Sequence, residues 1–367
     1  MTTNLIGPRL KALRETHGFD QEKVAAILGV GSRQIVSQIE TGERRVSGEE
    51  LTRLIDGLGA DLDYFTDPFR LEGEGAFSWR QSQCGTATLS AYQTKAGAWL
   101  AAYRHLAEQT NKPSSFRRSL RLDRSSSFDQ AAAEGERLAT EFDLGDVPAL
   151  RLGEVMEQAF DILVLMVDAP AGISGAACRL TELDAVLVNR LEVPGRRYFD
   201  LAHELFHLLT WDAMPPDPIE AIDAKGHVEK LANAFAGALL MPRSVIEGDW
   251  RKAGSVPALA AMINERADTL QVTAQALKWR LVTAKLLSRQ RATAIPDEML
   301  RHNGRSAVAV NTQPPLYSHR FMEVLGRGID HGFVSRRRAA RLLELSPHGR
   351  DLAELFEAHG LPVPEGL

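Results

Sequence analysis

The chain has 367 residues, of which 44% are hydrophobic and 25% charged, a composition typical of globular proteins with two or three domains. No apolar run is long enough to cross a membrane and no secretory signal begins the chain, so we expect a cytoplasmic protein. The net charge of −5 argues against a generally basic nucleic-acid binder, and two distant cysteines, Cys84 and Cys178, argue against a thiolate metal site.

Residues 1–66 are predicted to form a small all-α domain. Four short segments carry apolar residues at three- and four-residue spacing, and tight turns containing glycine separate them. The following stretch, 67–85, is rich in proline and glycine, which is typical of a linker. A domain boundary is therefore expected here.

Residues 86–295 are predicted to form a larger domain that begins with helices. Three short segments, 161–168, 173–180 and 184–189, then predict a small sheet. Two helices follow, the first over about 195–210 and the second ending where Met241 precedes a proline. Residues 296–367 are predicted to be a C-terminal helical region. The predicted fold class is therefore α+β and mainly helical.

The first of these two helices carries the motif HELFH. His203 and His207 are four residues apart, so both imidazoles project from one helix face and can bind one metal ion. Glu204 is placed to take a proton from metal-bound water and to protonate the leaving amine of a peptide. If the motif were accidental, its histidines would be ordinary helix residues. The flanking leucines predict a buried helix, however, and buried paired histidines need partners.

A catalytic zinc site usually has three protein ligands and one water. Glu229, at the start of the second helix, is the leading candidate for the third ligand. His227 is its rival, and Glu220 and Asp223 are weaker alternatives.

HELFH followed by EKLANAFAGALLMP resembles the ImmA/IrrE family of metallopeptidases, over roughly residues 150–242. The resemblance implies a zincin-like peptidase domain with His203, His207 and Glu229 as zinc ligands and Glu204 as general base. Asn233 would orient a ligand, and manganese is an alternative metal. Tyr198 and His227 are the candidates for stabilising the oxyanion. The implied activity is limited proteolysis of a repressor-like protein, which releases genes for a stress response or a mobile element.

Residues 9–58 resemble the XRE (Cro/C1-type) helix-turn-helix, with Gly29 at the turn and residues 32–40 as the recognition helix. Arg14 and Glu40 occupy the positions of a buried pair. Candidate base contacts lie near the start of the recognition helix, and candidate phosphate contacts lie beside it. The base-contact candidates are Ser32, Arg33, Gln34 and Ser37, and the phosphate candidates are Gln21, Arg44 and Arg45.

Local charge limits this DNA-binding prediction. Up to Tyr64, eight basic residues face ten acidic ones, although phosphate contacts supply much of the affinity for DNA. Tight binding of a monomer to a double-stranded operator is therefore not expected, and a homodimer, or help from the arginines at 117–124 or 336–341, would ease it. The alternative for this domain is a protein-interaction role. The alternative for both arginine clusters is a solvated helix face.

Two functions remain after these arguments. The first is a DNA-binding regulatory metallopeptidase that cleaves a repressor-like partner. The second is a transcriptional regulator or antitoxin whose peptidase-like domain senses or docks a partner without cutting it. The presence of Glu204 favours the first, because a purely structural zinc site has no need of a base.

Overall fold

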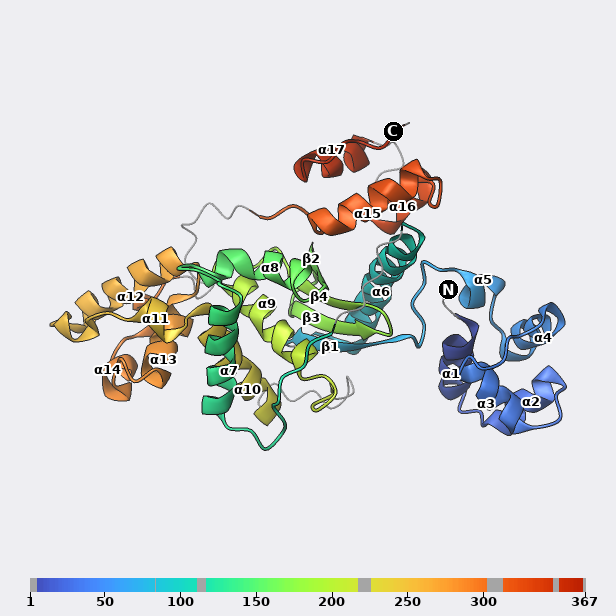
Figure 1. Ribbon diagram of the computed structural model, residues 1–367, viewed down its shortest axis with the longest axis horizontal. Helices are drawn as coiled ribbons and strands as arrows, with labels where there is room; N and C mark the ends of the chain where they lie inside the picture. The colour runs from blue at the N-terminus through green and yellow to red at the C-terminus, as the bar shows by residue number, and fades with distance from the viewer. Residues whose placement is uncertain are drawn as a thin grey trace.

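The computed structural model describes residues 5–82, 84–110, 117–216, 226–301, 313–345 and 350–365. A small sheet lies in the middle of an elongated, mainly helical chain, with one group of helices at each end (Figure 1). This arrangement confirms the predicted fold class. Within the described ranges, no helix is both long and apolar enough to cross a membrane.

The N-terminal domain is all helical, as predicted. Asp20 caps the second helix by accepting a hydrogen bond from the Lys23 amide, and Gly29 ends that helix at φ +70°, a conformation that favours glycine. Buried apolar side chains from every helix form one core, which includes Leu10, Val24 and Leu54. The five helices are α1 (Ile6–Thr16), α2 (Gln21–Leu28), α3 (Arg33–Glu40), α4 (Gly48–Leu58) and α5 (Leu62–Thr66).

The central sheet has four strands in the order β1-β3-β4-β2. The strands are β1 (Gly75–Gln81), β2 (Ile162–Val167), β3 (Ile173–Leu180) and β4 (Asp184–Asn189). β3 pairs antiparallel with both β1 and β4, and β4 pairs parallel with β2. The last three strands lie in the three segments predicted to be strands.

β1 corrects the prediction of a continuous linker over 67–85. Residues 75–81 form an edge strand, and Gly75 pairs with Leu180, more than one hundred positions later in the chain. Pro68 and Gly73 precede the strand and mark the loop that enters it, whereas Gly75 begins the strand and Gly85 follows it. A strand stabilised by so distant a partner leaves only a weak local signal, because strand propensity depends on its neighbours.

Both faces of the sheet are covered by helices, which explains why the middle residues of its central strands are mainly apolar. Alternate residues point to opposite faces. On β4, Val186 and Val188 contact the core beneath α8 (Pro148–Gln158) and α9 (Pro194–Leu209). Ala185 and Leu187 contact the second core, beneath α6 (Thr86–Gln109) and α15 (His319–Asp330).

α9 also packs against α10 (His227–Leu240), which in turn lies along α7 (Phe128–Glu141). The α7–α10 contact is close because Gly135 has no side chain: a Cβ there would lie 2.5 Å from the Phe235 carbonyl oxygen. A further helical group follows at the end of the molecule away from the N-terminal domain (Figure 1). It comprises α11 (Arg243–Ile246), η2 (Trp250–Lys252), α12 (Val256–Leu270), α13 (Ala274–Thr283), α14 (Arg289–Thr293) and η3 (Asp297–Met299).

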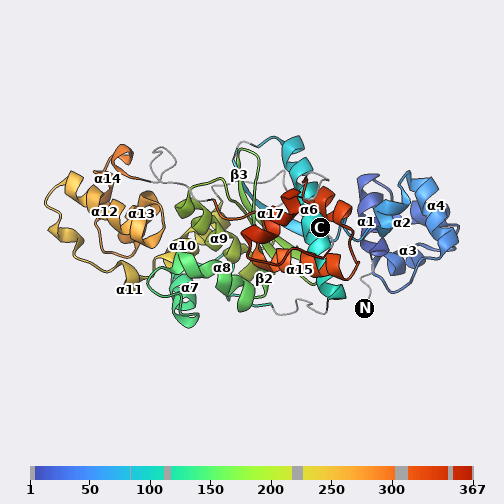
Figure 2. The same ribbon diagram turned by 90° about the horizontal axis from the view of Figure 1, so that it is seen from above.

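The C-terminal helices return to the middle of the molecule and lie beside α6 in both views (Figures 1 and 2). They are α15, α16 (Arg336–Leu342) and α17 (Arg350–Ala358). The Trp99 indole on α6 donates a hydrogen bond to the Leu342 carbonyl at 3.1 Å, and Lys95 pairs with Glu344 at 2.6 Å. The C-terminal region therefore packs on the core of the peptidase-like part.

Buried ion pairs join the N-terminal domain to α6. Arg9 on α1 is fully buried and contacts Glu74 at 2.7 Å, and the other oxygen of Glu74 lies 2.5 Å from Arg104 on α6. Arg9 also donates hydrogen bonds to the carbonyl oxygens of Tyr64, Asp67 and Arg70. One guanidinium thus ties together α1, the segment after α5 and the entry to β1.

Candidate metal centre and DNA-contacting face

α9 positions the two histidines of the HELFH motif. Pro194 occupies the first turn, where its fixed φ favours helix initiation and its missing amide hydrogen costs no bond. His203 and His207 lie one turn apart and are both buried. They face the first turn of α10, which supplies Glu229.

Three ligand atoms converge at this point. The Nε2 atoms of His203 and His207 are 3.1 Å apart, and the Glu229 carboxylate oxygens lie 3.1 Å from the first and 3.3 Å from the second. A tetrahedral zinc ion with bonds of about 2.0–2.1 Å would separate its ligand atoms by about 3.3 Å. The two histidine nitrogens have about this spacing, and each has one Glu229 oxygen at a similar distance, so the three side chains form a candidate zinc site.

The hydrogen bond of Asn233 defines which His203 nitrogen faces Glu229. The Nδ1–H group of His203 donates to Asn233 Oδ1 at 3.1 Å, which leaves Nε2 with a lone pair. This lone pair points toward a carboxylate oxygen and a second imidazole nitrogen. A cation between these atoms would relieve their mutual repulsion. The donor set is thus that of a metal site.

The ionisation of His203 and Glu229 favours metal binding. Burial, together with the charge of Arg80, lowers the pKa of His203 to about 3, so this imidazole is neutral at physiological pH. Burial would raise the pKa of Glu229, but its contacts with His203 and His207 outweigh burial and hold that pKa well below its usual range. Neutral histidine and ionised carboxylate are the forms that bind metals.

Glu204 lies beside the cluster and is almost completely buried. Burial raises its pKa well above the usual range, and the charge of Arg80 opposes this effect. Neither carboxylate oxygen has a hydrogen-bond partner among the described residues. The Glu204 side chain is accommodated over Gly175 of β3, where an added Cβ would lie 3.7 Å from Glu204 Cγ. An unpaired buried carboxylate beside a metal site is suited to proton transfer.

The other described ligand and oxyanion candidates are not part of the ligand cluster, although His227 lines the cavity beside it. His227 Nε2 contacts the Ser126 carbonyl oxygen at 3.0 Å, and its ring packs against Phe128, so His227 is outside the ligand cluster. Tyr198 packs against the large core on the α9 side of the sheet. Glu220 and Asp223 fall outside the residues that the structure describes.

Arg80 is a residue of this site that the sequence analysis missed. On β1 it pairs in register with Gly175, the residue over which Glu204 lies, and its Nε contacts Asp200 at 2.9 Å. Burial raises the pKa of Asp200 to about 6, although the charge of Arg80 lowers it. The alternation of Phe77, Ser78, Trp79 and Arg80 is the two-residue period of a strand, and it could have indicated β1.

A small cavity of about 150 Å³ opens beside the ligands. His207 and Glu229 form one side of it, and Ser78 and Trp79 of β1 form another. Since β1 is the edge strand of the described sheet, the candidate metal centre adjoins a strand edge with which no described strand pairs.

The predicted base contacts lie at the start of α3, for which Ser32 is the N-cap residue. Ser32, Arg33 and Gln34 are exposed, and Ser37 is half-buried. The expected Arg14–Glu40 pair is present, at 2.6 Å. It fixes α1 against the C-terminal end of α3 and leaves the N-terminal end of α3 exposed.

The predicted phosphate contacts differ from one another. Gln21 donates a hydrogen bond to Glu40 at 3.0 Å and Arg44 pairs with Glu50 at 2.7 Å, whereas Arg45 is exposed. Parts of the two arginine clusters also have internal partners: Arg118 pairs with Glu141, and Arg338 pairs with Asp67. Arg45 is therefore the most accessible of the three predicted phosphate contacts.

Comparison with known proteins finds family matches for two separate regions of the chain. Residues 5–64 match the family model of a helix-turn-helix domain, and residues 158–282 match that of the IrrE N-terminal-like domain, a peptidase family. The chain therefore carries a helix-turn-helix domain followed by an IrrE-like peptidase domain with a candidate His-His-Glu metal site. No curated protein matches the chain at a significant level.

Two solved structures align with nearly the whole chain at low similarity. The PrgX/cCF10 complex is 12% identical, with 98% of this chain and 93% of that chain covered and a TM-score of 0.17. A bacterial peptide pheromone/receptor complex is also 12% identical, with 97% and 98% covered and a TM-score of 0.16. TM-scores this low do not indicate a shared fold.

Proposed function

We propose that this protein is a DNA-binding regulator with a zinc-dependent endopeptidase domain that cleaves a repressor-like protein. One observation carries the proposal: His203, His207 and Glu229 converge with the spacing of zinc ligands, and the unpaired carboxylate of Glu204 lies beside them. A site that only stabilised the fold would have no need of this buried carboxylate, which is costly to leave without partners.

Each side chain has a separate role in the proposed reaction. Zinc, when bound, supplies the Lewis acid. Asn233 keeps the His203 ring in the orientation and tautomer that a ligand requires. Glu204 takes a proton from the attacking water at a carboxylate oxygen and delivers it to the nitrogen of the leaving amine. Burial raises the pKa of Glu204, and the charge of Arg80 opposes this effect and so favours the ionised form that accepts the proton.

The position of β1 supports a polypeptide as substrate. Ser78 and Trp79 line the same cavity as two of the ligands, and no described strand pairs with the outer side of β1. The backbone groups of an edge strand can pair with an extended segment of another protein. Such pairing would hold a polypeptide beside the metal centre.

The helix-turn-helix domain would bring this activity to DNA. Ser32, Arg33 and Gln34 are exposed at the N-terminal end of α3, the end of a recognition helix that contacts base edges. Arg45 is also exposed and can contact a phosphate. A homodimer would double these contacts and offset the excess of acidic residues in the domain. A repressor bound at the same operator is therefore a suitable substrate. Zinc suits the nitrogen and oxygen ligands, and manganese is the alternative.

The test compares the wild type with Glu204→Gln by mass spectrometry of newly formed protein N-termini. Each full-length protein is incubated with a lysate of the source organism, with zinc, with manganese or with a chelator. We expect metal-dependent N-termini in transcription repressors with the wild type and none with Glu204→Gln. The control is Glu265→Gln, which changes an exposed carboxylate on α12.

Metal content is measured for each protein, so that loss of the ion is distinguished from loss of the base. Identical N-termini from the wild type and Glu204→Gln, both loaded with metal, would contradict the proposal. That result would favour a domain that docks a partner without cutting it.

A further inference from the structure

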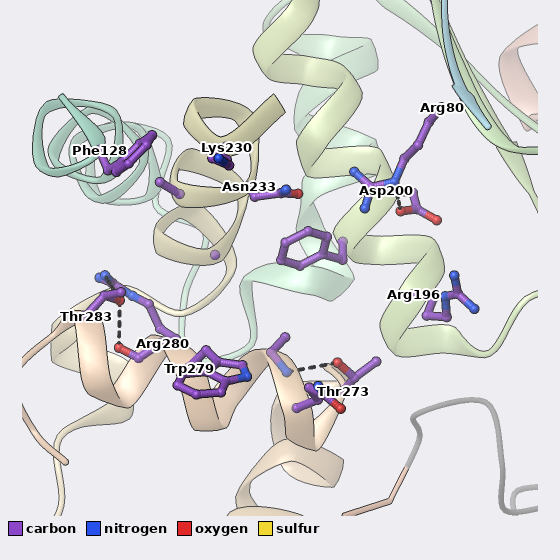
Figure 3. A pocket seen from close by; sticks show the side chains of 15 residues that line it. Arg80, Phe128, Arg196, Asp200, Lys230, Asn233, Thr273, Trp279, Arg280 and Thr283 are labelled. Atoms are coloured by element: carbon purple, nitrogen blue, oxygen red, sulfur yellow. Dashed lines mark hydrogen bonds and ion pairs between the residues drawn. The ribbon is translucent and has the colours of Figure 1, made fainter. Parts of the chain in front are cut away.

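A second and larger cavity lies close to the metal centre, in a groove between α9, α10 and α13. Its volume is about 570 Å³, and none of the three candidate ligands lines it. Figure 3 shows Lys230 and Asn233 on α10, Arg80 and Asp200 near α9 and Trp279 on α13 around one hollow. A volume of this size is in the range of ligand-binding cavities, about 300–1,000 Å³.

The walls of this groove are apolar and aromatic. Phe128, Phe199 and Trp279 all line it. Phe128 is 44% exposed and Trp279 is 37% exposed, and among the large hydrophobic side chains exposed in the described ranges only one other, Phe333, is aromatic. Exposed aromatic side chains that face one another across a groove indicate a binding surface for an apolar group.

The groove is also positively charged. Its lining contains Arg80, Arg196, Lys230 and Arg280 but only one acidic residue, Asp200. Arg196 and Arg280 are paired with Glu192 and Glu136, whereas no described residue forms an ion pair with exposed Lys230. The charge that remains favours an acidic ligand.

Arg80 adds a hydrogen-bond donor at the inner end of the groove. Its Nε contacts Asp200, but its Nη1 is buried and has no partner among the described residues. A buried donor of this kind needs an acceptor such as a main-chain carbonyl or a carboxylate. A polypeptide supplies both, together with apolar side chains for the aromatic walls.

The inner end of the groove adjoins the candidate catalytic groups. Arg80 pairs in register with Gly175, against which Glu204 lies. Asn233 lines the groove and also accepts the hydrogen bond of His203. A chain held in the groove would therefore continue toward the metal centre.

We propose that this groove binds the segment of the protein substrate next to the scissile bond and selects a bulky apolar side chain flanked by acidic residues. The apolar side chain lies between the aromatic walls, an acidic side chain pairs with Lys230, and an acceptor of the bound chain takes the free Nη1–H of Arg80. This inference rests on the proposed function, because it names the substrate class of that site.

Binding is measured first, without cleavage. Full-length Glu204→Gln is titrated into two fluorescein-labelled peptides, Gly-Asp-Leu-Phe-Asp-Gly and Gly-Lys-Leu-Phe-Lys-Gly, and fluorescence anisotropy is recorded. We expect the acidic peptide to bind about tenfold more tightly than the basic one, because the groove attracts one and repels the other. Equal affinity for the two peptides would overturn the charge selection.

Variants then locate the binding site. Trp279→Ala should weaken binding of the acidic peptide about tenfold, as loss of a tryptophan from a binding pocket commonly does. Lys230→Glu should weaken binding of the acidic peptide and strengthen binding of the basic one. The matched controls are Phe333→Ala, another exposed aromatic, and Lys11→Glu, another exposed lysine; both lie outside the groove. If Trp279→Ala binds as tightly as Phe333→Ala, the groove is not the binding site.

Cleavage of an unfolded protein separates this inference from the proposed function. Reduced and alkylated lactalbumin is incubated with zinc-loaded wild type, and the cut sites are mapped by mass spectrometry. If the peptides bind as expected but no cut is made, the peptidase function fails and the peptide-binding groove stands. The wild type should cut next to apolar residues flanked by acidic ones, and Trp279→Ala or Lys230→Glu should change the cut sites. If cuts are made without this preference, or if neither variant changes them, the groove proposal fails and the peptidase stands.

Discussion

Short sequence motifs indicate both the metal centre and the recognition helix, but the side chains of the two sites have opposite surroundings. His203 and His207 are buried and meet Glu229 and Asn233 from a second helix. The base-contact candidates on α3 are mainly exposed. The fold itself supplies every partner that the first site needs except the ion. The second site gains its partners only when DNA binds.

This difference separates what each motif predicts. For the metal centre, the structure brings the donors to the spacing that an ion requires, so geometry tests the motif directly. For α3, the structure shows only that the base-contact candidates are accessible, and the affinity for DNA also depends on charged residues outside the helix. The mutational effects should differ in the same way, with those at the preorganised site being the larger.

Removal of Glu229 should have the largest effect. Zinc affinity should fall about 100- to 1,000-fold in Glu229→Ala, because the roughly 10–16 kcal/mol by which structural zinc sites bind the ion is shared among four ligands. Competition with a chromophoric chelator measures the affinity, and Glu247→Ala, which removes an exposed carboxylate directly after α11, is the control. Unchanged affinity in Glu229→Ala would remove this residue from the site.

The effect of burial beside the metal centre can be measured at Asp200. Its pKa in the folded protein is about 6, raised by burial, against about 3.9 when unfolded. The folded state therefore binds the proton more tightly, and stability falls as the pH rises through this window. Relative to Asp200→Asn, the free energy of unfolding of the wild type should fall by about 2 kcal/mol between pH 4 and 7.

Urea unfolding followed by tryptophan fluorescence measures this difference. All five tryptophans lie outside the N-terminal domain, so the signal reports on the part of the chain that contains Asp200. If the stability of the wild type and of Asp200→Asn changes with pH in parallel, burial does not raise the pKa of the Asp200 carboxyl group.

The role of Asn233 should be smaller but measurable. Asn233→Ala removes the acceptor of the His203 Nδ1–H group and should weaken zinc binding about 10- to 100-fold, as loss of a ligand-orienting group does. Asn233→Asp keeps an acceptor and should retain zinc binding. Isothermal titration with zinc distinguishes the two variants. If both bind zinc as the wild type does, His203 needs no such support.

The recognition helix should show the smallest effect, and one that depends on DNA sequence. Arg33→Ala should lose about 1–3 kcal/mol of binding to a duplex selected from a random pool and should bind scrambled duplexes as before. Arg45→Ala should weaken both and reduce the salt dependence by about one phosphate contact. Titrations at several salt concentrations measure both quantities. Equal losses on both duplexes for Arg33→Ala would make Arg33 a phosphate contact.

Helical periodicity explains what could be predicted from the sequence. His203 and His207 lie on one helix, so their spacing alone predicts a shared face. Residues 227 and 229 are about 200° apart around a helix, and spacing alone does not show which of them faces α9. Glu229 is the leading candidate from its place at the start of the second helix, the family resemblance implies the same ligand, and the structure places it beside both histidines.

Long-range pairing explains what was missed. β1 was taken as linker because its partner, β3, lies about a hundred residues later in the chain. Arg80 and the part of the groove beside it were missed with it. The groove also combines residues of α9, α10 and α13 that share no local pattern. Contacts of this kind are visible only once the chain has folded.

The buried Arg9 guanidinium determines how long a segment must be transferred to move the DNA-binding domain to another protein. A gene fusion that transferred only residues 1–66 would carry all five helices of the domain but would leave behind Glu74 and the carbonyl groups of Asp67 and Arg70. A buried cation without its partners is strongly destabilising. The smallest segment that moves to another protein with this charge satisfied therefore extends through residue 74, up to the first strand of the peptidase-like sheet.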